Sequence, residues 1–157
     1  MLDEVTKKIN RAAEDAAAEA KPIFVNAITS ITISDGLTIL HGANNAATNY
    51  LKQKTYSALQ VAFQPKIATS LNKKIIGGIS AESAYSELIS KYNLAVSAAN
   101  LTGKNYPKVT TNSLSTYTTQ RALDGLFLKV AEEEADIRQN VNARVTDILK
   151  KVFGRKG

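Results

Sequence analysis

The sequence lacks cysteine and tryptophan, and it has a single histidine in 157 residues. The missing cysteines exclude disulfides, thiolate chemistry and every cysteine-based metal site. A zinc site would have to be rich in carboxylates, which is uncommon, and helical di-iron sites need two Glu-x-x-His pairs. The one histidine, His41, has Thr38 at that offset. The sequence therefore predicts no metal site and no cofactor.

Long apolar runs are also missing. No stretch approaches the roughly 18 residues needed to span a bilayer, so we predict no transmembrane segment. The start, Met1-Leu2-Asp3-Glu4, enters a charged helical pattern directly and does not resemble a signal peptide.

The motifs of common catalytic sites are absent as well. We find no Gly-x-Ser-x-Gly elbow, no phosphate-binding Gly-x-x-x-x-Gly-Lys loop and no Gly-x-Gly-x-x-Gly fingerprint. His41 precedes Gly42 at the predicted end of a helix, where the helix dipole favours a cationic imidazole. A capping role is therefore favoured over catalysis. We predict no catalytic residues and expect that the protein is not an enzyme.

What the sequence does contain is apolar residues at helical spacing along almost its whole length. Aromatic residues make up only 6%, so the core must rest on Leu, Ile, Val and many Ala. This pattern predicts an all-α fold, a compact single-domain bundle of about seven helices over residues 1–157, with an internal loop at 99–112. Breaks are expected at Pro22, near Pro65, at Gly77-Gly78 and around Asn140.

Polar residues mark the expected helix starts. Ser34 would open a short helix from Asp35 to His41 that Gly42 closes. The other predicted N-caps are Asn44 or Asn45, Ser80 or Ala81, and Ser113. The long helix after Ser113 is expected to bury Tyr117, Leu123, Leu126, Phe127, Val130 and Ile137.

The net charge of +6 is unevenly distributed. Between Gly36 and Ala81 there are five lysines and no acid, and on one straight helix four of them would share a sector of roughly 100°. These four are Lys52, Lys66, Lys73 and Lys74. They are the predicted surface for an anionic ligand, such as a lipid or an envelope polymer. Nucleic acid is not expected, because no helix-turn-helix or zinc-finger pattern accompanies the lysines. The alternative, which we favour, is that acidic and basic helices pack together and neutralise one another.

Acidic residues gather at Glu132-Glu133-Glu134. Glu134 follows the predicted buried stripe, and Arg138 lies four residues later, in the order that favours an ion pair on a helix. We interpret the two as a structural pair at the edge of the core, with a cation or substrate site as the alternative. The other residues considered for a polar site or for ion pairs are Arg11, Glu14 and Asp124.

Several strings resemble a known bacterial family. They are Asn10–Ala16, Ala20–Phe24, Ala46–Leu51, Ser90–Asn93, Arg121–Phe127, Ala131–Glu134 with Ile137-Arg138, and Asp147–Gly154. Together they are similar to the family called domain of unknown function 4197. The resemblance implies an all-helical fold and an exported protein of the periplasm or cell envelope. It also implies a leader region ahead of residue 1, which this chain is expected to lack. Asn44-Asn45 stand where relatives tend to carry an acidic pair, which weakens any cation site there.

The leading functional hypothesis is a non-enzymatic envelope protein that binds a partner, or a hydrophobic or anionic ligand. One rival is an enzyme that uses the carboxylates of Glu14, Asp15, Asp124 and Glu134, brought together by folding. The other is a purely structural or assembly module.

Overall fold

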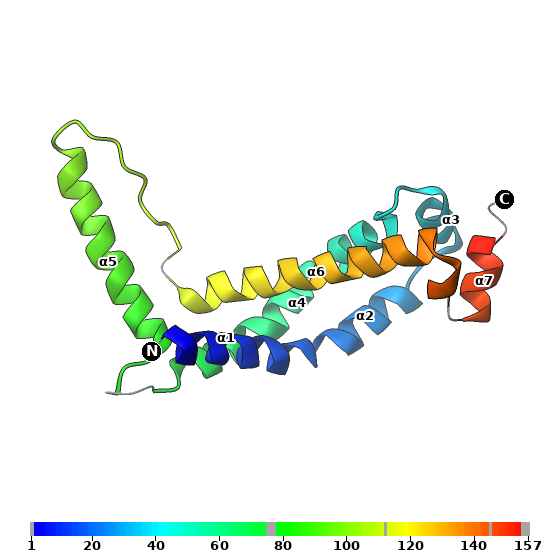
Figure 1. Cartoon of the computed structure of the whole chain (residues 1–157), viewed down its shortest axis with the longest axis horizontal. Helices are drawn as coiled ribbons and strands as arrows, with labels where there is room; N and C mark the ends of the chain where they lie inside the picture. Colours follow the sequence, from blue (N-terminus) through cyan, green and yellow to red (C-terminus); the bar gives the residue numbers. More distant parts are fainter. Residues whose placement is uncertain (1, 75–77, 112, 145, 155–157) are drawn as a thin grey trace. The chain divides into compact units, whose positions relative to one another are not determined.

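The computed structural model describes residues 2–74, 78–111, 113–144 and 146–154. They form α1 (Leu2–Ala17), α2 (Ala20–Thr29), α3 (Ile33–His41), α4 (Ala46–Asn72), α5 (Ala81–Asn100), α6 (Leu114–Gln139), the short 3-10 helix η2 (Val141–Ala143) and α7 (Asp147–Gly154) (Figure 1). No strand occurs among the described residues, in which one isolated bridge joins Lys74 and Ser80. The predicted all-α fold of about seven helices is confirmed.

Contacts between residues divide the chain into two compact units. The first consists of Met1–Lys21 and Leu59–Ala122, and the second of Pro22–Ala58 and Leu123–Gly157. Of the three boundaries, one falls at the start of α2 and the other two fall inside α4 and α6, so that α4 and α6 each contribute to both units.

The core of the first unit is built on the C-terminal half of α4. Leu59, Phe63, Ile67 and Leu71 recur every four residues, and all four are at most 2% exposed. Pro65 lies inside this stretch, yet α4 continues through it to Asn72. The predicted break near Pro65 is therefore wrong. Proline removes one backbone hydrogen bond, and the buried side chains on both sides of it favour the continuous helix strongly enough to offset that loss.

Helix caps explain most of the boundaries. Ser80 caps α5 in a capping box with Ser83, and the Ser113 hydroxyl accepts from the backbone N–H of Thr116 in the first turn of α6, as predicted. The predicted cap of α3 is wrong by two residues. Thr32, not Ser34, caps α3: its hydroxyl accepts from the Asp35 N–H, and the Asp35 carboxylate accepts from the Thr32 N–H, which together form a capping box.

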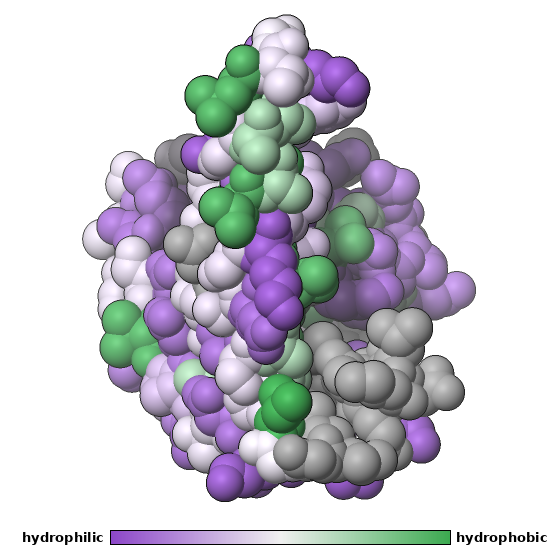
Figure 2. Space-filling model, turned by 90° about the vertical axis from the view of Figure 1, so that its left-hand side faces the viewer, coloured by the Kyte–Doolittle hydropathy of each residue, from purple (hydrophilic) through white to green (hydrophobic). Residues whose placement is uncertain are grey.

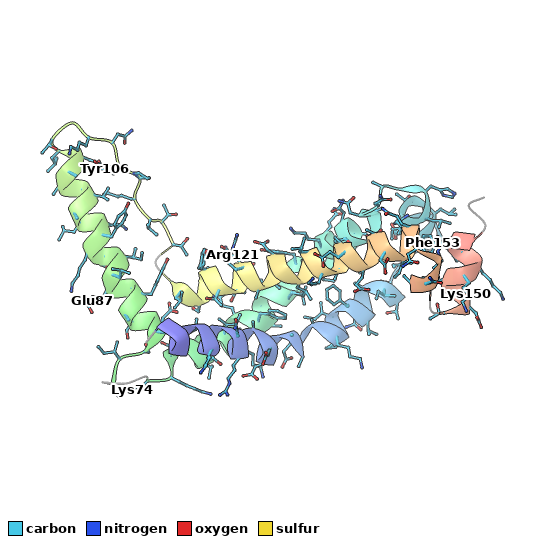
Figure 3. All side chains as sticks on the ribbon, in the orientation of Figure 1. Lys74, Glu87, Tyr106, Arg121, Lys150 and Phe153 are labelled. Carbon is cyan, nitrogen blue, oxygen red and sulfur yellow. The ribbon has the colours of Figure 1, made fainter. Side chains whose placement is uncertain are left out.

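The segment after α5 runs back along that helix as a strap (residues 104–111), as Figure 1 shows. The amide of Asn93 exchanges two hydrogen bonds with the backbone of Val109, at 2.8 and 2.9 Å. The amide of Asn100 does the same with Tyr106, near the tip of the strap (Figure 3). Two hydroxyls of α5 also donate to strap carbonyls, those of Tyr85 and Tyr92. The strap lies within the loop predicted at 99–112, although α5 itself continues to Asn100.

Large apolar side chains on α5 and at its C-cap, Leu101, are exposed among the described residues. Leu88, Leu94 and Leu101 are each more than 60% exposed. In Figure 2 the strongly apolar side chains stand in separate spots among polar ones rather than in one continuous stripe.

Phe127 of α6 is the centre of the second unit's core. It is 4% exposed and packs edge-on against Phe24 of α2, with ring centroids 6.0 Å apart. Tyr56 of α4 stacks on its other side at 6.2 Å. Leu123 is fully buried as predicted, but Tyr117 is 46% exposed, so its place in the buried stripe was wrong. Tyr117 instead carries the Arg121 guanidinium over its ring.

Candidate functional site

A buried carboxylate organises the second unit. Glu134 of α6 accepts hydrogen bonds from the backbone N–H groups of Ala47 and Thr48, at 2.9 and 2.7 Å, and from the Thr48 hydroxyl at 2.8 Å. These donors belong to the first turn of α4, where backbone N–H groups have no partner within the helix. Glu134 therefore caps α4 from another helix. Asn45, one of the two predicted caps, directly precedes α4, but among the described residues the side-chain bonds to the first turn come from Glu134.

Arg138 completes this arrangement. Its Nε and Nη2 lie 2.9 and 2.8 Å from one oxygen of Glu134, and the two side chains are 7% and 9% exposed. The guanidinium also donates to the backbone carbonyls of Ile39 at 2.7 Å and Leu40 at 3.3 Å, in the last turn of α3. The negative charge of Glu134 thus lies at the N-terminus of α4, and the positive charge of Arg138 lies at the C-terminus of α3. Both charges interact favourably with the helix dipoles.

The pKa of Glu134 is lowered from its ordinary value. Burial acts to raise it, but the hydrogen bonds from Ala47, Thr48 and Arg138 together outweigh burial. The carboxylate is therefore ionised at neutral pH. Because both charged groups are bonded to one another and to the backbone of α3 and α4, the pair is an internal joint between helices.

An apolar groove of about 440 Å³ lies over this joint. Its walls come from α3, α6 and α7, with Ala47 of α4, and the apolar side chains that line it are Ile39, Ala47, Leu126, Val130, Ile137, Leu149 and Phe153. Phe153 lies beside the end of α6 (Figure 3), with its ring 5.6 Å from the Arg138 guanidinium. Lys129 and Glu133 are exposed and border the groove.

A second, polar cleft lies among α2, α3 and α4. It consists of two adjoining cavities of about 450 and 220 Å³ that share Asp35 and Tyr50. Hydrogen bonds from Thr32 are the main reason that the pKa of Asp35 is lowered, and Lys54 adds to the effect. The pKa of Tyr50 is raised, first by partial burial and then by the charge of Asp35. Lys54 lies over the Tyr50 ring, 5.6 Å from its centroid.

The family follows from a match over almost the whole sequence. The profile of a family described as "Protein of unknown function (DUF4197)" matches residues 1–154. The chain belongs to the DUF4197 family. Searches of curated proteins and of solved structures found no match.

Three strings that carry the resemblance to the DUF4197 family meet at Glu134. Ala46–Leu51 supplies the backbone donors, Ala131–Glu134 the carboxylate and Ile137-Arg138 the guanidinium. A fourth string, Asp147–Gly154, is α7 and supplies Phe153 and Leu149 to the groove. Much of the sequence pattern therefore falls on the joint and on the groove above it.

The four predicted lysines do not gather on one unit. Lys52 belongs to the second unit, where it lies over the rings of Tyr56 and Phe127 at 5.7 and 5.8 Å. Lys66, Lys73 and Lys74 belong to the first unit. Lys66 pairs with Glu19 at 3.2 Å, and Lys74 forms the bridge with Ser80.

The other predicted polar residues are likewise divided. Arg11 and Glu14 are exposed on α1 in the first unit, while Asp124, Glu134 and Arg138 belong to the second. None of the three cavities described above is lined by two of the carboxylates proposed for an enzyme, which are Glu14, Asp15, Asp124 and Glu134. Among the described residues no group of three His, Asp or Glu side chains could hold a metal ion.

His41 lies in the last turn of α3, as predicted. Its Nδ1 is 3.0 Å from the backbone oxygen of Leu37, and its side chain is exposed. Within the described part of the chain, no single helix is long and apolar enough to cross a membrane. The bent pair Ala13–Thr29 and Ile33–His41 meets that criterion jointly, by length and composition only.

Two features escaped the sequence reasoning. The groove depends on α7 folding back so that Leu149 and Phe153 face α6, and periodicity within one helix does not reveal the neighbour that it meets. The polar cleft depends on Asp35, whose partner Thr32 was available as a signal: Thr32-x-x-Asp35 has the spacing of a capping box.

Proposed function

We propose that this protein is a non-enzymatic binding protein of the cell envelope that holds a single apolar chain, such as the acyl chain of a lipid, in the groove over the Glu134–Arg138 joint. The observation that carries the proposal is the lining of the groove, which is apolar from Ile39 on α3 to Phe153 on α7. Its volume of about 440 Å³ falls in the usual range for a small ligand, about 300–1,000 Å³.

The chemistry beneath the groove supports an apolar ligand over a polar one. The Glu134 carboxylate and the Arg138 guanidinium are engaged with each other and with backbone groups of α3 and α4. A polar ligand would have to displace one of these partners and leave a buried charge unpaired, which costs several kcal/mol. Apolar contact remains as the main source of affinity, at roughly 0.8 kcal/mol for each buried methylene group.

The rim of the groove suits the head of such a ligand. Lys129 is exposed and pairs with Glu132 at 2.5 Å, and ion pairs of this kind contribute little to stability. Lys129 can therefore exchange Glu132 for an acidic head group at small cost. In this proposal Lys129, rather than the four lysines predicted from the sequence, contacts the anionic part of the ligand.

A tryptophan placed in the groove tests the proposal directly, because the natural chain has none. In Leu126→Trp, dodecanoic acid that carries bromine on its chain should quench the indole fluorescence with a saturable curve, below the concentration at which the acid forms micelles. Bromine quenches by contact, so the signal reports a chain that lies in the groove.

The matched control is Leu88→Trp on α5, where the side chain is 63% exposed and belongs to the first unit. Its fluorescence should change little over the same titration. Equal quenching in both variants, or none in Leu126→Trp with its helical circular dichroism intact, would contradict the proposal.

The envelope location rests on the export that the resemblance implies, and acyl chains are abundant at that location. Fractionation of cells that express the full natural gene product should recover the protein with periplasmic or membrane markers. Recovery with cytoplasmic markers alone would remove this part of the proposal and leave the groove to be tested as above.

A further inference from the structure

The polar cleft offers a carboxylate oxygen that accepts no hydrogen bond from the described residues. All three side-chain hydrogen bonds of Asp35 go to Oδ2: from the Thr32 N–H at 3.1 Å, from the Thr32 hydroxyl at 2.7 Å and, weakly, from the Tyr50 hydroxyl at 3.5 Å. Oδ1 accepts none of these bonds. The capping box thus fixes the orientation of the carboxylate while leaving one oxygen for an outside donor.

The opposite charge lines the same cleft. Lys54 of α4 is exposed, with its ammonium 5.6 Å from the centroid of the Tyr50 ring, and its charge acts on Asp35 without a salt bridge between them. Four other lysines, in contrast, do form ion pairs: Lys66, Lys91, Lys129 and Lys150. Asp35 and Lys54 therefore line one cavity of about 450 Å³ without forming an ion pair with each other at 4.0 Å or less.

The remaining surface of the cleft is partly apolar. Ile23 and Ala27 of α2 and Ala58 of α4 lie beside the two charged residues, together with the buried Thr55. A ligand with one charge would satisfy either the aspartate or the lysine and leave the other. A ligand with both charges and a small apolar body would match all three features.

We propose that this cleft binds a small zwitterion, whose protonated amine meets Asp35 Oδ1 and whose acid group meets Lys54. A protonated amine is a donor to a carboxylate, and the lysine ammonium supplies donors to a carboxylate or a phosphate. A free amino acid and a phosphoethanolamine head group share this chemistry. The cavity lined by Asp35 and Lys54 shares no lining residue with the apolar groove, so this proposal does not depend on that groove.

The test is a titration of the whole chain followed by ¹H–¹⁵N NMR, with L-valine and phosphoethanolamine as probes and with methylamine and acetate as singly charged controls. Each zwitterion that fits should shift the signals of the cleft residues and bind about tenfold more tightly than either control. Tighter binding of valine would identify a free amino acid as the source, and tighter binding of phosphoethanolamine a head group. Zwitterions that bind no more tightly than methylamine or acetate would overturn the proposal.

Variants separate charge recognition from folding. Lys54→Met should weaken zwitterion binding about tenfold, whereas Lys52→Met, on the same helix but outside the cleft, should leave it unchanged. Lys54→Glu should reverse the preference, so that methylamine binds more tightly than valine. Zwitterion affinity that is the same in Lys54→Met as in the natural chain would refute the assignment.

One further variant distinguishes this proposal from the proposed function. Val130→Asp places a charge on the wall of the apolar groove and lies outside the cleft. It should abolish binding of the brominated chain and leave zwitterion binding intact, so that the two proposals can be refuted independently.

Discussion

Glu134→Gln removes one negative charge from the point where α4 begins, with almost no change in the shape of the side chain. Four donors face that carboxylate in the folded protein: two backbone N–H groups, the Thr48 hydroxyl and the Arg138 guanidinium. Glutamine offers one acceptor oxygen in place of two and points an amide N–H₂ at groups that are themselves donors. The Arg138 charge, 7% exposed, loses its counter-charge.

The expected loss in the free energy of unfolding follows from the burial of the Glu134–Arg138 pair. Breaking a buried ion pair by removing one partner costs about 3–5 kcal/mol. We expect the lower end, about 3 kcal/mol, because the amide oxygen retains one bond and Arg138 keeps the carbonyls of Ile39 and Leu40. For a chain of this length that corresponds to a fall in Tm of about 6–12 °C.

Urea unfolding followed by circular dichroism measures the difference in free energy. The matched control is Glu132→Gln, two residues earlier on α6, whose partner Lys129 is exposed, so its change should stay below about 1 kcal/mol. A Glu134→Gln variant that unfolds within about 0.5 kcal/mol of the natural chain would refute the claim that this carboxylate joins the helices. A double variant with Arg138→Met should be less destabilised than the sum of the single variants, since the two side chains share one interaction.

Four further outcomes can be measured on the same chain. The pKa of Glu134 is lower in the folded chain than its ordinary value of 4.5. The stability that this carboxylate contributes is therefore complete above pH 4.5 and is lost as the pH falls through the folded-state pKa. In urea unfolding at acidic pH, the natural chain's advantage in stability over Glu134→Gln should accordingly shrink below pH 4.5. Asn93→Ala should release the strap, so that trypsin cleaves within residues 104–111 several-fold faster. The control is Ser90→Ala, at an exposed position on the same helix, which trypsin should cleave there at the natural rate. Gly42→Ala should destabilise the chain by about 1–3 kcal/mol, because the new Cβ would lie 2.6 Å from that of Ala46. Gly125→Ala should instead stabilise it by about 0.5–1 kcal/mol in thermal unfolding, since nothing lies within 4 Å of the added atom inside α6.

Local chemistry predicted local structure well. Ser80 and Ser113 were identified as caps because a helix N-cap needs only a hydroxyl and the backbone three residues ahead. Glu134 and Arg138 form the expected pair for the same reason: a spacing of four on one helix brings two side chains together whatever surrounds them.

Contacts between segments that are distant in the sequence could not be predicted. Glu134 caps α4 and Glu82 caps α6, through bonds to Leu114 and Ser115, and no sequence spacing encodes a cap that comes from another helix. The division into two units could not be predicted either. No linker marks it in the sequence, because α4 and α6 each contribute to both units. Pro65 shows the converse error, in which a valid local rule was overridden by burial of the residues around it.

The central claim is that the second unit binds one apolar chain in the groove over the Glu134–Arg138 joint. Isothermal titration of the natural chain with octanoate, decanoate and dodecanoate tests it most directly. Each pair of added methylene groups should tighten binding by about 1.6 kcal/mol, roughly 15-fold, until the groove is full, and a charge placed in the groove by Val130→Asp should remove the effect. Affinity that does not change with chain length, or that survives Val130→Asp in full, would contradict the account.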